Sequence, residues 1–213
     1  MGPIGIFGGT FDPIHYGHLR TALELKERLS LNEVRFIPCA DPPHRQSEPV
    51  AGASRLEMVR AAVADEPGFV VDEREFDREG PSYTVDTLRS IREEIADIPL
   101  CLLMGMDAFL SLTEWYCWKE LFSLAHIVVA HRPGWRVSAD GALGELLRDR
   151  NTNEISELHG SVCGRIYVTP VTQLEISATE LREGLNAGLD PRYLVPDSVR
   201  QMLLEAELYA KEG

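Results

Sequence analysis

Residues 8–18 read Gly-Gly-Thr-Phe-Asp-Pro-Ile-His-Tyr-Gly-His, and the stretches on either side of them decide the fold. Residues 3–7 form a short apolar run typical of a buried strand, and residues 17–29 carry leucines at helical spacing. A second apolar run, residues 34–37, completes a strand–helix–strand unit. Because such a crossover is right-handed in nearly all proteins, we expect residues 8–18 at the carboxyl edge of a parallel sheet, where ligands bind.

The same alternation of apolar runs and helical segments continues along the chain. It predicts an α/β fold, a Rossmann-like doubly wound parallel sheet with helices on both faces. The further strands that we expect are residues 69–71, 100–104, 126–130 and 165–168.

Helices and loops complete the expected architecture. Helices are expected over residues 54–64, 85–95 and 143–147, the second of them capped by Ser82 or Thr84. Residues 40–53 contain three prolines and predict a long loop. We expect one domain, 1–213, with a Rossmann-like core over 1–175 and a small helical C-terminal part over 176–213.

Composition and charge limit the class of protein and its partners. The 213 residues include 34 acidic and 21 basic side chains, a net charge of -13, so duplex nucleic acid is not an expected partner. No apolar run reaches the roughly 18 to 20 residues of a membrane helix, and no basic leader begins the chain, so we expect neither membrane insertion nor export. The cysteines lack metal or disulfide spacing, which predicts a reduced, cytoplasmic protein; they are Cys39, Cys101, Cys117 and Cys163.

The chemistry of residues 8–18 points to an anion. Gly8 and Gly9 allow close approach of the backbone, and free amides at the start of a helix favour a phosphate. The loop has no lysine and fits neither the Walker nor the GxGxxG pattern. His15 and His18 could instead donate to phosphoryl oxygens in a phosphoryl or nucleotidyl transfer. A simple turn and a pair of capping or core histidines are the alternatives, and zinc ligation lacks a third partner.

A second polar segment, residues 176–182, reads Ile-Ser-Ala-Thr-Glu-Leu-Arg. Ser177 and Glu180 have the spacing of a capping box at a helix start. Ser177, Thr179 and Arg182 also bring two hydroxyls and a guanidinium to a helix terminus, which suits a second anion. Only the fold could bring this segment to residues 8–18.

The stretch GGTFDPIHYGH resembles the signature of nucleotidyltransferases with an HxGH motif, relatives of the class I aminoacyl-tRNA synthetases. A synthetase is excluded because the chain has no room for a tRNA-reading domain and contains no KMSKS sequence. Residues 176–182 resemble the ISxTxxR motif that grips the β and γ phosphates of ATP in that superfamily. Ala178 stands where many relatives have serine, so no hydroxyl acts there.

Short motifs in the middle of the chain indicate the acceptor. Segments 42–45, 81–84, 105–107, 114–116 and 131–134 occur in the order and spacing of bacterial nicotinate mononucleotide adenylyltransferases, a resemblance that covers nearly the whole chain. It implies transfer of the adenylyl group of ATP to nicotinate mononucleotide, giving nicotinate adenine dinucleotide and pyrophosphate. The residues that it implies for the mononucleotide are His44, Arg45, Thr84, Asp107, Trp115, Tyr116 and Arg132.

Several of these residues also have a simpler interpretation. Asp107 follows an apolar strand, so it could accept from a ribose hydroxyl or cap a helix. Trp115 and Tyr116 offer faces to a charged pyridinium ring, although core packing is commoner for such residues. Arg132 follows a strand and would serve phosphate, and the pair 44–45 could belong to a solvated surface.

The resemblance also implies a division of roles. The attacking phosphate is already an anion, so alignment and charge neutralisation suffice. Gly8, Gly9, Thr10, Phe11 and His15 would orient ATP, His18 would contact the α-phosphoryl oxygens, and Ser177, Thr179 and Arg182 would hold the leaving group. Mg²⁺ would arrive on ATP, because no dedicated metal cage is evident.

Two other functions stay open at this point. One is adenylyl transfer to another phosphorylated acceptor, nicotinamide mononucleotide or phosphopantetheine; the other is a noncatalytic nucleotide-binding module. A homo-oligomer also stays open.

Overall fold

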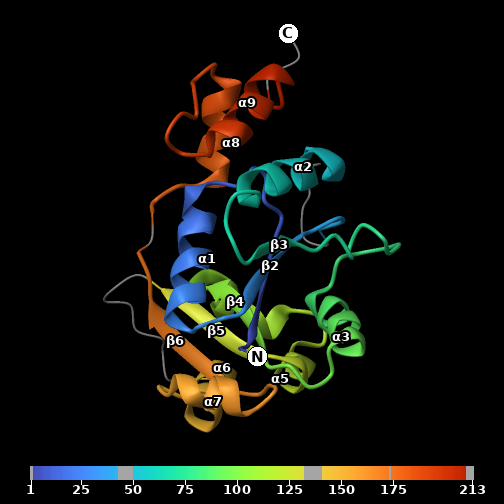
Figure 1. The fold of residues 1–213 in the computed structure, drawn as a ribbon, viewed down its shortest axis with the longest axis vertical. Coiled ribbons are helices and arrows are strands. Elements are labelled where there is room, and N and C mark those ends of the chain that lie inside the picture. Colours follow the sequence, from blue (N-terminus) through green and yellow to red (C-terminus); the bar gives the residue numbers. More distant parts are fainter. Residues whose placement is uncertain (1, 43–49, 132–140, 173, 210–213) are drawn as a thin grey trace.

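The computed structural model describes residues 2–42, 50–131, 141–172 and 174–209. Within these ranges the chain forms a six-stranded parallel sheet of order β3-β2-β1-β4-β5-β6 (Figure 1). The doubly wound α/β prediction is confirmed, with strand ends shifted by one or two residues. The strands are β1 (Ile4–Gly9), β2 (Glu33–Pro38), β3 (Phe69–Val71), β4 (Leu100–Gly105), β5 (His126–His131) and β6 (Ile166–Pro170).

Helices cover both faces of the sheet because its strands bury side chains on both sides. In β4, Leu102 and Met104 belong to one core cluster and Leu103 to the other, as the two-residue period of a strand requires. Helices α1, α2 and α7 pack on the face of Leu103, and α3, α4 and α5 on the opposite face. The helices are α1 (Tyr16–Arg28), α2 (Gly52–Val63), α3 (Thr84–Glu94), α4 (Met106–Leu110), α5 (Leu121–Leu124), α6 (Gly141–Arg150), α7 (Ile155–Gly160), α8 (Ala178–Asn186) and α9 (Asp197–Glu205).

The strand order reverses at the centre of the sheet. β1 pairs with β4, and from this pair the chain winds outward through β2 and β3 in one direction and through β5 and β6 in the other. The carboxyl ends of β1 and β4 therefore diverge into loops that leave a crevice between them, the usual position of a ligand in such sheets.

The predicted cap of the helix after residue 83 is wrong. Tyr83 is the N-cap residue of α3, and its side chain makes no capping bond. The Ser82 hydroxyl instead accepts from the Asp41 amide at 3.2 Å, and the Ser82 amide donates to the Asp41 carbonyl at 2.9 Å. These bonds tie the loop after β2 to the start of α3, so the hydroxyl is used for tertiary structure. The predicted long loop ends at α2, and its residues 43–49 lie outside the described ranges.

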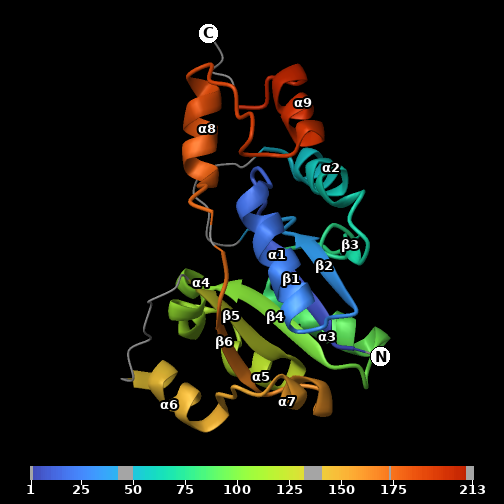
Figure 2. The same cartoon turned by 60° about the vertical axis from the view of Figure 1, so that its left-hand side comes forward.

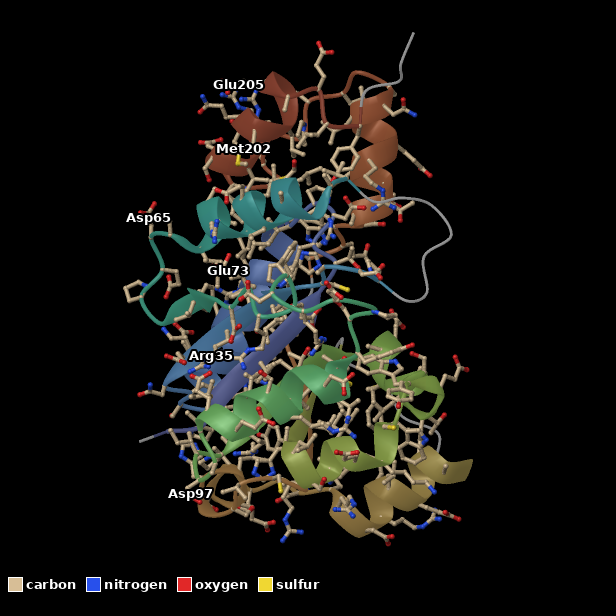
Figure 3. The ribbon with its side chains drawn as sticks, turned by 90° about the vertical axis from the view of Figure 1, so that its right-hand side faces the viewer. Arg35, Asp65, Glu73, Asp97, Met202 and Glu205 are labelled. Carbon is tan, nitrogen blue, oxygen red and sulfur yellow. The ribbon has the colours of Figure 1, made fainter. Side chains whose placement is uncertain are left out.

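The C-terminal helices stand beyond the carboxyl edge of the sheet (Figure 2). Figure 3 shows Met202 and Glu205 on α9, which lies over α2. Val199 and Leu203 of α9 belong to the same core cluster as Met58 of α2, and the Ser198 hydroxyl donates to the Ala61 carbonyl at 3.1 Å. In the part of the chain that the structure describes, we find no helix with the length and apolarity of a membrane span.

Candidate active site

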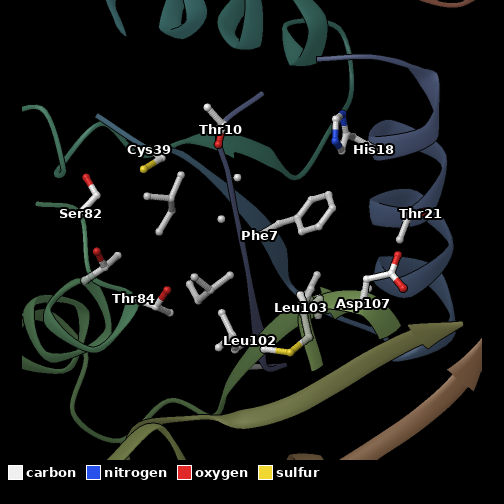
Figure 4. A pocket seen from close by; sticks show the side chains of 18 of the residues that line it. Phe7, Thr10, His18, Thr21, Cys39, Ser82, Thr84, Leu102, Leu103 and Asp107 are labelled. Carbon is white, nitrogen blue, oxygen red and sulfur yellow. The ribbon is translucent and has the colours of Figure 1, made fainter. Parts of the chain in front are cut away.

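A cavity of about 660 Å³ opens at the carboxyl edge of the sheet, between the ends of β1 and β4 (Figure 4). This volume is within the range typical of small-molecule sites. Many residues singled out in the sequence line it: Gly8, Gly9, Thr10, His15, His18, Thr84, Asp107, Trp115 and Tyr116. Phe11, Ser177, Thr179 and Arg182 do not line it, and His44, Arg45 and Arg132 lie outside the described residues.

The two histidines form a stacked pair at the start of α1. Their ring centroids are 3.7 Å apart and their planes differ by 24°. The His15 amide donates to Nδ1 of His18 at 3.3 Å, so the proton of a neutral His18 ring is on Nε2. The Phe11 ring supports His18 edge-on, with centroids 5.2 Å apart. Neighbouring groups therefore hold the ring of His18 as a hydrogen-bond donor at the cavity wall.

Gly17 makes room for this stacked pair. A Cβ atom at Gly17 would lie 2.9 Å from Nδ1 of His15 and 3.5 Å from the Leu174 carbonyl. Any side chain would push His15 out of the stack. The glycine of the HxGH pattern is thus explained by packing in this chain.

Both imidazoles are neutral at pH 7. Burial lowers the pKa of His15 to about 4. Burial, together with the neighbouring His15, lowers the pKa of His18 to about 3. Nδ1 of His15 is buried and meets no hydrogen-bond partner among the described residues. The two rings can therefore form hydrogen bonds with an anion while carrying no positive charge of their own.

These pKa values predict an acid-dependent loss of stability. Because the folded protein binds these protons less readily than the unfolded chain, the free energy of unfolding falls as pH drops below about 6.5 toward 3, and is unaffected above that range. His18→Gln should therefore lose less stability than the unchanged protein between about pH 6.5 and 4, as measured by urea unfolding. His159→Gln is the control, because this exposed residue of α7 lies away from the pair and glutamine can keep a hydrogen bond to the Leu29 carbonyl, which lies 2.9 Å from Nε2 of His159. Parallel curves for His18→Gln and the unchanged protein would contradict the prediction.

The fold brings the segment of residues 176–182 into contact with the loop of residues 8–18. Arg182 Nη1 donates to the Asp12 carbonyl at 2.7 Å, and Nη2 donates to the Thr179 hydroxyl at 3.2 Å. The Ser177 hydroxyl accepts from the Glu180 amide at 3.4 Å and so caps α8. Leu174 and Ile176 supply the cavity wall here, whereas the guanidinium of Arg182 is directed at the loop.

Asp12 connects the loop of residues 8–18 to the C-terminal part of the chain. It is buried, and its carboxylate accepts from the Tyr209 hydroxyl at 2.5 Å and lies 3.8 Å from Arg182. Burial and the bond to Asp12 raise the pKa of Tyr209, so the phenol stays protonated as a donor. Tyr209, the last described residue, therefore contacts the loop of residues 8–18 directly.

The other end of the cavity carries aromatic side chains. Trp115 and Tyr116 follow a short 3-10 helix, and the Tyr116 ring lies against Tyr83 with centroids 4.6 Å apart. Asp107 is in the first turn of α4, whose N-cap residue is Gly105, so the capping interpretation of Asp107 is wrong. Figure 4 shows Ser82 and Thr84 across the cavity from Asp107 and His18.

Sequence reasoning missed two buried charged residues beside this cavity. Arg55 is 1% exposed and donates to four carbonyls, those of Thr10, Cys39, Ala40 and Val50. It clamps the segments that leave β1 and β2. A charged residue at helical spacing before the apolar Met58 and Val59 was the available signal.

Glu75 is the second missed residue. It is 7% exposed, lines the cavity and accepts from the Thr87 hydroxyl at 2.6 Å. It lies in the irregular segment before α3, where no periodicity marks a side chain as buried.

Comparison with known proteins agrees with this arrangement. The model of the cytidylyltransferase-like family matches residues 6–184. A protein of Aeromonas hydrophila named "Probable nicotinate-nucleotide adenylyltransferase" is 50% identical over 207 residues, 97% of each chain. One of the same name from Methylococcus capsulatus is 49% identical over 209 residues, 98% of this chain and 100% of the relative.

The fold is also that of solved structures. A structure of Plasmodium falciparum nicotinic acid mononucleotide adenylyltransferase complexed with NaAD superposes with a TM-score of 0.75 at 16% identity, covering 98% of each chain. The same protein complexed with APC gives a TM-score of 0.71. At this identity the likeness concerns the fold alone. With half of its residues shared over nearly full length, the chain belongs to the cytidylyltransferase-like family and, within it, to the nicotinate-nucleotide adenylyltransferases.

Proposed function

We propose that the protein transfers the adenylyl group of ATP to nicotinate mononucleotide and releases nicotinate adenine dinucleotide and pyrophosphate, a step of NAD biosynthesis. One observation carries this function: a single cavity joins the phosphate loop and His18 at one end to Thr84, Trp115 and Tyr116 at the other. The names of full-length relatives support the same reaction.

The reaction needs alignment more than proton transfer. An oxygen of the mononucleotide 5′-phosphate forms a bond to the α-phosphorus of ATP, and the bond from that phosphorus to the pyrophosphate oxygen breaks. Since the nucleophile is already ionised, no general base is required. The protein's task is to place the two phosphates in line and to stabilise the charge that develops on the α-phosphoryl oxygens.

His18 is the residue proposed to meet that charge. Its Nδ1 accepts from the His15 amide, so its Nε2–H is free to donate to an α-phosphoryl oxygen. Gly8, Gly9, Thr10, Phe11 and His15 form the loop that orients ATP. Ser177, Thr179 and Arg182 are proposed to hold the leaving pyrophosphate, and Arg182 already contacts the loop through Asp12.

Trp115 and Tyr116 are proposed to cover the pyridine ring, Thr84 to bind its carboxylate and Asp107 to accept from a ribose hydroxyl. For His44, Arg45 and Arg132 a role toward the mononucleotide stays a prediction from the sequence. A cytoplasmic location and a homo-oligomer also stay predictions.

Mg²⁺ is proposed to arrive with ATP. Among the described residues, no group of three histidine, cysteine or acidic side chains could hold a metal ion, and Mg²⁺ typically needs only one or two carboxylates besides phosphates and waters. The ion would supply neutralisation of phosphate charge.

Product analysis tests the function. The protein with ATP and Mg²⁺ is offered nicotinate mononucleotide, nicotinamide mononucleotide or phosphopantetheine, and the adenylylated product is separated and weighed by mass spectrometry. We expect the highest kcat/KM with nicotinate mononucleotide. A higher kcat/KM with either other acceptor, or no product from any, would overturn the proposal.

Gly8→Ala tests the phosphate loop without disturbing the fold. Gly8 lines the cavity, and a Cβ built on it meets no atom of the described residues within 4 Å. The methyl group would occupy space reserved for ATP, so we expect KM for ATP to rise about tenfold with an unchanged urea midpoint. Gly160→Ala, equally unobstructed and outside the cavity, should change neither. An unchanged KM for Gly8→Ala would place ATP elsewhere.

A further inference from the structure

Glu75 is a buried charged residue of the cavity wall for which the reaction described above provides no use. Its Oε1 accepts from Thr87, but its Oε2 is buried and meets no hydrogen-bond donor among the described residues. Leaving a buried carboxylate oxygen unpaired is costly, so such a group in a ligand cavity calls for a partner that arrives with the ligand.

The position of Glu75 is at the acceptor end of the cavity. Thr87, its hydrogen-bond donor, follows Thr84 by three residues in α3, so the two threonines are neighbours on one helix face and both line the cavity. Glu75 thus accepts from a residue that lies about one helical turn from Thr84, the residue proposed to bind the carboxylate of the acceptor ring.

The surroundings keep this carboxylate in place. Arg78 Nη2 lies 3.5 Å from the Thr87 hydroxyl, which in turn donates to Glu75. Cys39 lies close by on the β2 side, where burial, and after it the charge of Glu75, raises the pKa of the thiol to about 11.

The substrates offer one organic cation. ATP is anionic throughout, and the mononucleotide carries a phosphate, a carboxylate and a positively charged N-alkylated pyridine ring. A buried carboxylate is repelled by every anionic group of the two molecules, and Mg²⁺ would stay on the phosphates of ATP at the other end of the cavity. The favourable partner of Glu75 is therefore the ring. We infer that Glu75 is a specificity-determining residue whose unpaired oxygen faces the pyridinium ring of the acceptor and selects for its positive charge.

This inference rests on the proposed function. It is tested by removing the charge of residue 75 and, separately, the charge of the acceptor ring. Glu75→Gln keeps an acceptor for Thr87 and removes the negative charge. The probes are nicotinate mononucleotide and its 1,4-dihydro form, whose ring is uncharged. For each, kcat/KM is measured with ATP and Mg²⁺, and binding is followed by calorimetry. Product formation by the unchanged protein tests the function separately.

We expect Glu75→Gln to lower kcat/KM about tenfold for the charged acceptor, mainly through KM, and less than about twofold for the dihydro form. KM for ATP should stay the same. Glu79→Gln, exposed on the same segment, should change neither acceptor. Equal losses for both acceptors would assign Glu75 to a hydroxyl, a water or the structure, and would overturn the inference. If Glu75→Gln lowers the urea midpoint, the ratio of the calorimetric affinities for the charged and the dihydro acceptor still tests the inference, because misfolding weakens both affinities equally.

Discussion

His18→Ala is expected to lower kcat by about a hundredfold or more, the loss typical when a donor that stabilises transition-state charge is removed. The proposed donor is a neutral ring whose Nδ1 accepts from the His15 amide, which leaves Nε2–H available for an α-phosphoryl oxygen. Because this bond strengthens as the oxygens gain charge, kcat should fall much more than KM for ATP rises. Initial rates of dinucleotide formation at saturating substrates measure the effect.

Two further variants test whether the loss of kcat is specific to the hydrogen-bond donor at position 18. His159→Ala removes an exposed imidazole outside the cavity and should leave kcat unchanged. His18→Gln keeps an N–H donor, so its kcat should lie between those of the alanine variant and the unchanged protein. A His18→Ala protein that unfolds at the normal urea concentration and retains near-normal kcat would remove His18 from the mechanism.

Arg55→Leu is expected to lower the free energy of unfolding by about 3 kcal/mol or more, since breaking a buried charged network costs about this much. Leucine replaces the stem of the side chain but supplies none of the donors for the carbonyls of Thr10, Cys39 and Ala40. These carbonyls belong to segments that leave adjacent strands, so the cavity should lose its shape as well. Urea unfolding measures the stability, and KM for both substrates reports the cavity.

The matched control for Arg55 is on the same helix. Arg60 of α2 is exposed and pairs with Glu57 and Glu73 at the surface. Exposed pairs of this kind contribute little, so Arg60→Leu should leave the unfolding midpoint nearly unchanged. Equal effects of the two substitutions would mean that the buried hydrogen bonds of Arg55 contribute no more than a surface pair.

The sheet could be predicted from the sequence because its strands are buried on both faces. Runs such as residues 100–104 are apolar throughout, and helices α1 and α3 show apolar residues at helical spacing. Helices α4, α5 and α7 were not predicted. They span five, four and six residues, too few to show a helical period, and tertiary packing rather than local pattern forms them.

The loop of residues 8–18 could be singled out from the sequence because its residues are contiguous, and the resemblance singled out Trp115 and Tyr116. The structure places both in the wall of one cavity. Neither route found Glu75, which becomes buried only when the segment before α3 packs at the end of β2. The same limit applies to Arg182. Its residue type predicted phosphate binding, but only the structure shows its bonds to Asp12 and Thr179.

Because the strands are parallel, the edge of the sheet opposite the cavity is suited to attaching a probe. Every strand runs toward the cavity, and β4 starts just after the exposed turn that contains Asp97 (Figure 3). At about 3.3 Å per residue, its six residues separate that turn from the cavity by about 20 Å. Arg92 braces the turn by donating to the carbonyls of Ile95 and Ile98. A fluorophore or a surface linker attached at position 97 would therefore have a firm base and leave the mouth of the cavity open.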